Sequence, residues 1–186
     1  MPIREHINIS SVTFLDYIES TGTQYIDTLV KATECFGIKL IYQSPTLQSG
    51  YPPIISSTLD NFTLANYSNY GTYLRYRGSD VYRSWPRNTN VNTCVLMNGV
   101  ASYTGGPNKT ISTLSLGSDN NNIHIFHSAT GGRFGKYRLM HLEMYADQQG
   151  NLLRLYKPAF IGRPGLLDII NSDFYTNAGA GEFLYN

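Results

Sequence analysis

Short runs of alternating apolar and polar residues are the feature that most constrains the fold of this chain. Clusters of Gly, Asn, Ser and Pro interrupt the runs about every ten residues, a spacing typical of antiparallel sheets in a sandwich or barrel. Helical patterning is nearly absent. The 15 Tyr, 8 Phe and 17 Gly residues agree with this, because aromatic residues favour strands and glycine favours turns. We therefore expect an all-β fold.

The positions of these runs predict individual strands. The expected strands are Thr23–Leu29, Cys35–Tyr42, Pro53–Thr58, Asn61–Tyr67, Thr72–Arg77, Asn92–Met97, Ile111–Leu116, Ile123–His127, Gly135–Tyr145, Leu152–Pro158 and Gly165–Asp168. Tight turns are expected in the segments "NYSNYGT" and "YADQQGN" and at Asn98-Gly99, because Asn and Gly tolerate the positive φ angles of hairpin turns.

Length and charge set the broad class of protein. A chain of 186 residues fits one domain, which we place at residues 13–186, and the polar segment 1–12 is predicted to be an N-terminal arm. The balance of 14 basic against 13 acidic residues gives a net charge of +1, which is too weak to favour a nucleic acid or an anionic membrane as partner. No apolar run approaches the roughly 18 residues of a membrane span, and the first residues lack the apolar core of a signal peptide.

The two cysteines, Cys35 and Cys94, do not define a disulfide framework. Free buried thiols are the favoured interpretation, and a bond between the two remains the alternative.

A search for catalytic chemistry finds no supporting motif. The patterns GxSxG and HExxH and a Gly-rich phosphate loop are absent, and the four histidines show no zinc-like grouping. His124 and His127 lie three residues apart on an expected strand, which predicts that they point to opposite faces. Glu143 is alone on its strand, so the paired carboxylates of a glycosidase are not seen. We do not expect an enzyme.

The two ends of the chain carry its most specified segments. "LDYIESTGTQYIDT" (Leu15–Thr28) and "GLLDIINSDFYTNAGAGEF" (Gly165–Phe183) resemble the end signatures of a laminin-G-like, concanavalin A-like jelly-roll domain. "VLMNGV" and "NLLRLYKPAF" look like internal strands of the same family. The resemblance implies an antiparallel two-sheet jelly-roll sandwich, in which the two signatures meet where the sheets close and in which Phe174 and Phe183 anchor in the core.

The resemblance also bears on function. Domains of this kind are common in tailed-bacteriophage structural proteins and in surface proteins of gut bacteria, which implies a non-enzymatic virion component: a head decoration, head-fibre or tail-associated protein at the particle exterior. Its partners would be other virion proteins or copies of itself. Some laminin-G-like domains bind calcium, and Asp119, Asn120 and Asn121 are the weak candidates here, although Asp and Asn also cluster in ordinary turns. No other cofactor is expected.

The richest candidate binding surface lies between Asn66 and Trp85, and its ligand-binding candidates are Tyr70, Tyr73, Arg75, Arg77, Tyr82 and Trp85. Alternation places Tyr73, Arg75 and Arg77 on the outer face of one strand and Leu74 and Tyr76 toward the core. Tyr and Arg there can contact sugars or a protein partner. The alternative is a solvated sheet surface held by Tyr–Arg pairs.

Two functional hypotheses follow. The first is the virion component, held to the particle by the arm 1–12 and contacting host surface glycans. The second is a carbohydrate-binding module of a bacterial or phage surface protein. They differ in the exposure they require of the aromatic residues, because a sugar-binding site needs accessible rings.

Overall fold

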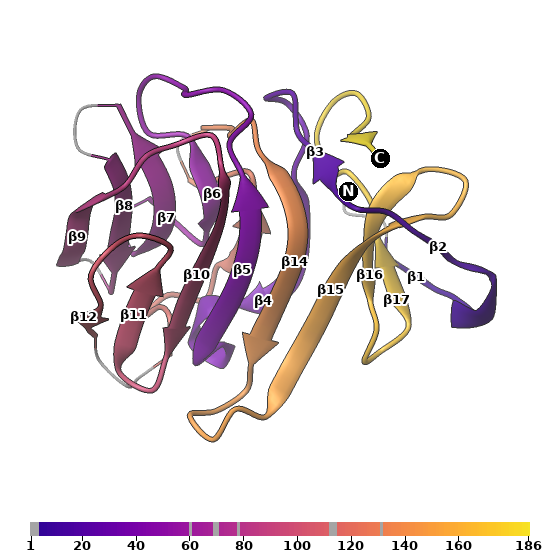
Figure 1. Cartoon of the computed structure of the whole chain (residues 1–186). Coiled ribbons are helices and arrows are strands. Elements are labelled where there is room, and N and C mark those ends of the chain that lie inside the picture. Colours follow the sequence, from indigo (N-terminus) through magenta and orange to yellow (C-terminus); the bar gives the residue numbers. More distant parts are fainter. Residues whose placement is uncertain (1–3, 60, 69–70, 78, 112–114, 131) are drawn as a thin grey trace.

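The chain folds into two antiparallel β-sheets that face each other (Figure 1). The computed structural model describes residues 4–59, 61–68, 71–77, 79–111, 115–130 and 132–186, with the backbone alone described at 79–84. Within these residues the only helices are two short 3₁₀ turns, η1 (Ile9–Ser11) and η2 (Ala32–Glu34). The prediction of an all-β sandwich is confirmed. No helix in the described part of the chain is long and apolar enough to cross a membrane.

The larger sheet has twelve strands among the described residues. In spatial order its main path is β1 (Arg4–His6), β17 (Asp173–Tyr175), β16 (Pro164–Asp168), β15 (Leu152–Phe160), β14 (Arg138–Tyr145), β5 (Gly37–Gln43), β10 (Val91–Met97), β11 (Val100–Tyr103) and β12 (Lys109–Thr110). Three short strands join from the side: β2 (Thr13–Phe14) pairs with β15, and β3 (Ile18–Glu19) pairs with β14 and with β18 (Leu184–Tyr185).

The smaller sheet has six strands over the same described residues. Their order is β4 (Ile26–Lys31), β13 (Asn122–Ile125), β6 (Pro53–Ser56), β7 (Phe62–Tyr67), β8 (Gly71–Tyr76) and β9 (Ser79–Trp85). Most of the strands predicted from the sequence are present, with ends that differ by a few residues. Of the expected strand Ile111–Leu116, residues 112–114 lie outside the described residues, and the neighbouring strand β12 comes earlier in the chain.

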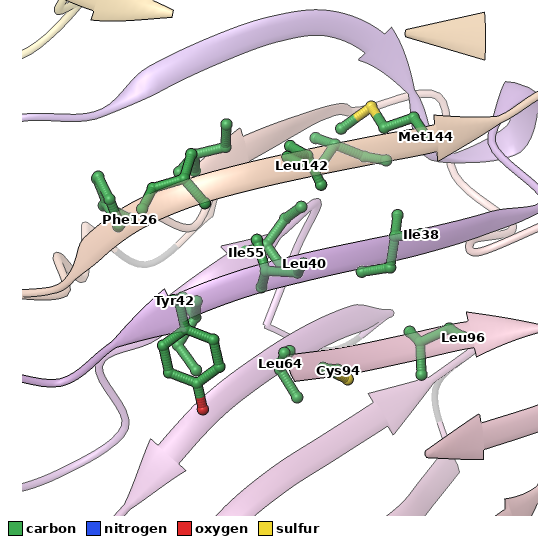
Figure 2. Packing of buried hydrophobic residues seen from close by; sticks show 14 of the residues in the cluster. Ile38, Leu40, Tyr42, Ile55, Leu64, Cys94, Leu96, Phe126, Leu142 and Met144 are labelled. Atoms are coloured by element: carbon green, nitrogen blue, oxygen red, sulfur yellow. The ribbon is translucent and has the colours of Figure 1, made fainter. Parts of the chain in front are cut away.

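The core lies between the sheets and follows from the alternation along the strands. Ile38, Leu40 and Tyr42 of β5 are fully buried and point toward Ile55 and Leu64 of the smaller sheet (Figure 2). Alternate residues of β5 therefore reach the apolar layer between the sheets, as the period-two pattern predicts.

The expected Asn-Gly hairpin is also confirmed. Asn98 and Gly99 have φ angles of 51° and 74°, which is the left-handed backbone of a tight hairpin turn, and they join the paired strands β10 and β11.

The two end signatures meet, as the resemblance implies. Strand β3 pairs with β18, the amide of Ala178 donates to the carbonyl of Tyr25 at 2.9 Å, and the amide of Ala180 donates to the carbonyl of Thr23 at 3.2 Å. Phe183 is 2% exposed within the main core. These segments, which lie about 150 residues apart in sequence, therefore close one end of the sandwich.

Of the predicted N-terminal arm, the described residues 4–12 lie against the larger sheet. Strand β1 pairs with β17, and Arg4 forms an ion pair with Asp173 at 2.5 Å. Ile7, Ile9 and Val12 pack on a small second apolar cluster formed by Ala159, Leu167 and Phe174. The arm is docked because the outer face of β15–β17 presents apolar residues that would otherwise be exposed to water.

Both cysteines are free and fully buried. Burial raises the pKa of each thiol to about 12, so neither is a thiolate at neutral pH. The favoured interpretation of the sequence is confirmed.

Candidate functional site

The outer face of the smaller sheet carries a row of polar residues that crosses its strands. Register pairing aligns Asp27 with His124, His124 with Ser56, Ser56 with Thr63, and Thr63 with Arg75. Residues paired in register point to the same side of a sheet. The adjacent row is Ile26, Ile125, Ile55, Leu64 and Leu74, and all five belong to the core. The polar row therefore faces away from the core.

Two adjoining hollows lie on this outer face. The first has a volume of about 220 Å³ and is lined by Tyr51, Leu59, Thr63, Tyr73, Arg75 and Arg133. The second, of about 360 Å³, is lined by Gln48, Ser49, Gly50, Tyr51, Pro52, Arg133 and Phe134. Tyr51 and Arg133 belong to both, so the two hollows are continuous.

Aromatic rings gather where the two hollows adjoin. The rings of Tyr51 and Tyr67 stack with centroids 3.7 Å apart, and the ring of Tyr73 meets Tyr51 edge-on at 6.2 Å. The guanidinium carbon of Arg133 lies 5.1 Å from the centroid of the Tyr51 ring, within the range of a cation–π interaction. One face of Tyr51 is therefore covered by a tyrosine and Arg133 also lies against the ring.

Arg75 and Arg133 differ in burial and in how firmly the protein holds them. Arg75 is half-buried and its guanidinium donates to the carbonyl of Leu59 at 3.4 Å, so it is held in the wall of the first hollow. Arg133 is exposed and follows a glycine in the loop before β14. Its planar group has up to five N–H donors, so Arg133 is the side chain best able to reach a polar ligand.

The structure brings together only part of the site predicted from the sequence. Tyr73 and Arg75 lie on the outer face and line the first hollow, as predicted, although Tyr73 is only 4% exposed. Arg77 follows the end of β8 in a turn with φ of 51°, so it is not on the predicted strand. Tyr70 lies outside the described residues, as does the side chain of Tyr82.

The assignment of Trp85 to the binding surface is wrong. Trp85 pairs in register with Thr72, which faces the interior, and the indole is fully buried. It stacks on Tyr103 of the opposite sheet, with centroids 5.2 Å apart, and its Nε1 donates to the carbonyl of Pro107 at 2.9 Å. The physical reason is the strand period, which places Trp85 on the face of the sheet that meets the other sheet.

Tyr51, Leu59 and Arg133 were not predicted to contribute to the site. Each lies outside the strands, and the three meet only through the pairing of distant strands. A Tyr beside two prolines and an Arg beside two glycines carry no pattern that identifies a binding residue, because both are common in ordinary turns.

The prediction for His124 and His127 is also wrong, because both lie on the same side of the sheet. Their Nδ1 atoms are 3.0 Å apart. Strand β13 ends at Ile125, and Phe126 has a φ of 66° and turns into the core, so two consecutive residues point inward. The alternation is shifted by one residue, which returns His127 to the outer face. Burial lowers the pKa of both imidazoles, to about 4 for His127.

The calcium candidates form a hydrogen-bonded turn. A carboxylate oxygen of Asp119 accepts from the backbone amide of Asn121 at 2.8 Å, and the other accepts from the side-chain amide of Asn61. Asn120 accepts from the hydroxyl of Thr33 at 3.4 Å. Both carboxylate oxygens thus serve as acceptors within the loop, which is the behaviour of an Asx turn. The described residues contain no group of three His, Cys, Asp or Glu side chains placed to hold a metal ion.

A second polar cluster lies on the outer face of the larger sheet. Glu143 accepts from Lys39 at 3.1 Å and from the hydroxyl of Tyr145, and it contacts Nε2 of His141 at 2.6 Å. Strand β14 carries no second carboxylate, as the sequence predicts, and the partners of Glu143 are a lysine, a tyrosine and a histidine. Burial opposes its ionisation, but the hydrogen bonds from Tyr145, His141 and Lys39 outweigh burial and bring the pKa of Glu143 to about 2. A carboxylate held ionised in this way is unsuited to act as a general acid.

Acid pH is expected to destabilise the fold through His127. Its pKa in the folded chain is about 4, below the ordinary value of 6.5, so between these pH values the unfolded chain binds a proton that the folded chain does not. Stability should therefore fall as pH drops from 7 to 5. Urea unfolding at both pH values measures the drop, which should be smaller in His127→Phe. An equal drop in His127→Phe would show that His127 is not the source of the pH dependence.

No family model matches the chain, and no curated protein matches it significantly in sequence.

Proposed function

We propose that this chain is a non-enzymatic carbohydrate-binding module whose site is the pair of hollows on the outer face of the smaller sheet. The observation that carries the proposal is the placement of Arg133 against the stacked tyrosines at the boundary between the hollows. Sugars present hydroxyl groups around an apolar ring, and they fit sites that combine aromatic walls with a few fixed donors.

The side chains of the first hollow support binding rather than catalysis. Its six lining residues are three of aromatic or aliphatic character, one threonine and two arginines. None of them is a carboxylate, histidine or thiol that could exchange a proton or attack a substrate near neutral pH. Arg133 and the hydroxyl of Tyr51 supply hydrogen bonds to a ligand, and the ring walls exclude water from one side of it.

The test is a glycan array probed with the wild type and with Arg133→Ala and Tyr51→Ala. We expect the wild type to bind a defined group of glycans and each variant to lose at least about tenfold in affinity, as for a central side chain of a binding site. Ile170→Ala is the control, since Ile170 is 46% exposed and lies outside both hollows and outside the proposed contact surface between copies. Equal binding by Arg133→Ala and the wild type would reject this site.

Arg133→Lys refines the test. Lysine keeps the positive charge but lacks the planar set of donors, so we expect it to restore little of the lost affinity. Full recovery with lysine would show that charge alone, rather than directed hydrogen bonding, attracts the ligand.

A second proposal concerns the assembly in which the module works. Under the jelly-roll resemblance, the chain is a structural or accessory component at the exterior of a tailed-phage particle, and its partners are copies of itself or other virion proteins. Three exposed apolar side chains favour such contacts: Phe14 on β2 and Leu184 and Tyr185 on β18, which are 48–54% exposed. Large exposed apolar residues that gather together often mark protein interfaces.

Light scattering after size-exclusion chromatography tests the self-association. We expect a closed oligomer, and Phe14→Ser with Leu184→Ser should convert it into monomers without loss of the folded structure. A wild type that remains monomeric at high concentration would count against contacts between copies.

A further inference from the structure

A second set of ring side chains lies on the same outer face, beyond the two hollows. His127 is half-buried, and the rings of Tyr25 and Phe134 both lie 4.5 Å from its imidazole, centroid to centroid. Phe134 also lines the second hollow. Ring contacts therefore lead from the second hollow to the histidine pair. The first hollow on β8 and His124 on β13 are separated by three strand spacings, or about 14 Å.

The two imidazoles meet edge to edge. Their Nδ1 atoms are 3.0 Å apart, their planes differ by 19°, and their centroids are 5.3 Å apart. The centroid separation is about the Nδ1–Nδ1 distance plus one ring radius on each side, so both nitrogens lie on the line between the rings. This is the geometry of a nearly coplanar hydrogen bond, in which one Nδ1 carries the proton and the other accepts it.

Asp27 decides which imidazole donates. Its carboxylate lies 3.7 Å from Nε2 of His124, and a negative charge there favours a proton on that nitrogen. The carboxylate is itself fixed by the side-chain amide of Asn122, at 3.0 and 3.2 Å. Neutral His124 then carries its proton on Nε2 and accepts at Nδ1. His127 must be the donor at Nδ1, which leaves Nε2 of His127 without a proton.

We propose that Nε2 of His127 is a hydrogen-bond acceptor for a ligand hydroxyl, and that it forms an outer subsite for a glycan that extends from the hollows across the sheet. Among the described residues no side chain or backbone group donates to this nitrogen. This inference rests on the proposed carbohydrate binding, and it specifies the ligand as an oligosaccharide chain rather than a single sugar.

The residues around His127 have separate roles in this subsite. Asp27 and His124 are positioning residues that fix the proton of His127, and Tyr25 and Phe134 hold its ring in place. Within this outer subsite, Nε2 of His127 supplies the hydrogen bond to the ligand. At neutral pH the pair is uncharged, consistent with the effect of burial on both imidazoles.

The first measurement is independent of any ligand. Long-range ¹H–¹⁵N NMR spectra of the full chain at pH 7 should show His124 protonated at Nε2 and His127 protonated at Nδ1. Asp27→Leu, which removes the carboxylate, should shift the proton of His124 toward Nδ1. A wild-type His127 that carries its proton on Nε2 would overturn the inference whatever the chain binds.

The second measurement uses the glycan that gives the strongest array signal with the wild type, together with its shorter fragments. Removal of one hydrogen bond predicts that His127→Phe binds the long glycan about five- to tenfold more weakly but binds the shortest fragment equally. His6→Phe, at an exposed histidine on β1, should match the wild type. Unchanged binding of the long glycan by His127→Phe, with binding still lost in Arg133→Ala, would reject the subsite and keep the proposed function. A wild type that binds no glycan would reject both.

Discussion

Gly179→Ala is expected to lower the free energy of unfolding by about 3 kcal/mol or more, among the largest effects of a single methyl group. A Cβ atom at Gly179 would lie 2.0 Å from the carbonyl oxygen of Thr23, which is backbone and cannot move aside cheaply. Gly179 also lies between Ala178 and Ala180, whose amides bond to the N-terminal signature. The added methyl group must therefore separate the two segments that close the sandwich.

Urea unfolding followed by circular dichroism measures this loss. Gly150→Ala is the control, because Gly150 has φ of +87° but no atom within 4 Å of the added carbon, and it should lose only about 1 kcal/mol from backbone strain. If Gly179→Ala is no less stable than the Gly150→Ala control, the two end signatures do not pack as described.

Trp85→Ala is expected to lower stability by about 3–5 kcal/mol, the usual cost when a large aromatic core residue is truncated. The indole joins the two sheets through its stack on Tyr103, and truncation would leave a cavity there. It would also leave the carbonyl of Pro107 without the indole donor. Trp85→Phe retains a ring and should lose less, about 1–2 kcal/mol.

Chemical denaturation measures these losses, with Ile170→Ala at an exposed position as the control. Ile170→Ala should remain within about 0.5 kcal/mol of the wild type. The fluorescence of Trp85, which is the only tryptophan, adds a second check: acrylamide should quench it poorly, and glycan binding should leave it unchanged. Ready quenching of the native protein by acrylamide would show that Trp85 is exposed to solvent, which would contradict its place in the core.

The strands and the Asn-Gly hairpin could be predicted because they depend on local patterns. Alternation along "GIKLIYQ" predicts which side of β5 is buried, and Asn98-Gly99 predicts its hairpin from backbone preferences alone. The end signatures are long enough that their pairing could be inferred from the resemblance.

The candidate site was harder to predict because it depends on contacts between distant residues. Tyr51 and Arg133 are about 80 residues apart and come from loops, where the sequence carries little information on position. The φ angle of Phe126 shifts the strand alternation by one residue, and no sequence rule predicts a positive φ at phenylalanine. Trp85 was misassigned because an aromatic residue near a Tyr/Arg strand fits a binding surface and a core equally well, and composition alone does not choose between them.

The most direct test of the central claim is a titration of the ¹⁵N-labelled chain with the array-positive glycan, followed by backbone amide shifts. The two outer faces carry different polar clusters, so the map of shifted residues distinguishes them. We predict shifts centred on Tyr51, Thr63, Tyr73 and Arg133, with a smaller group at His127. Shifts centred on Lys39 and Glu143 of the larger sheet would contradict the assignment of the binding face.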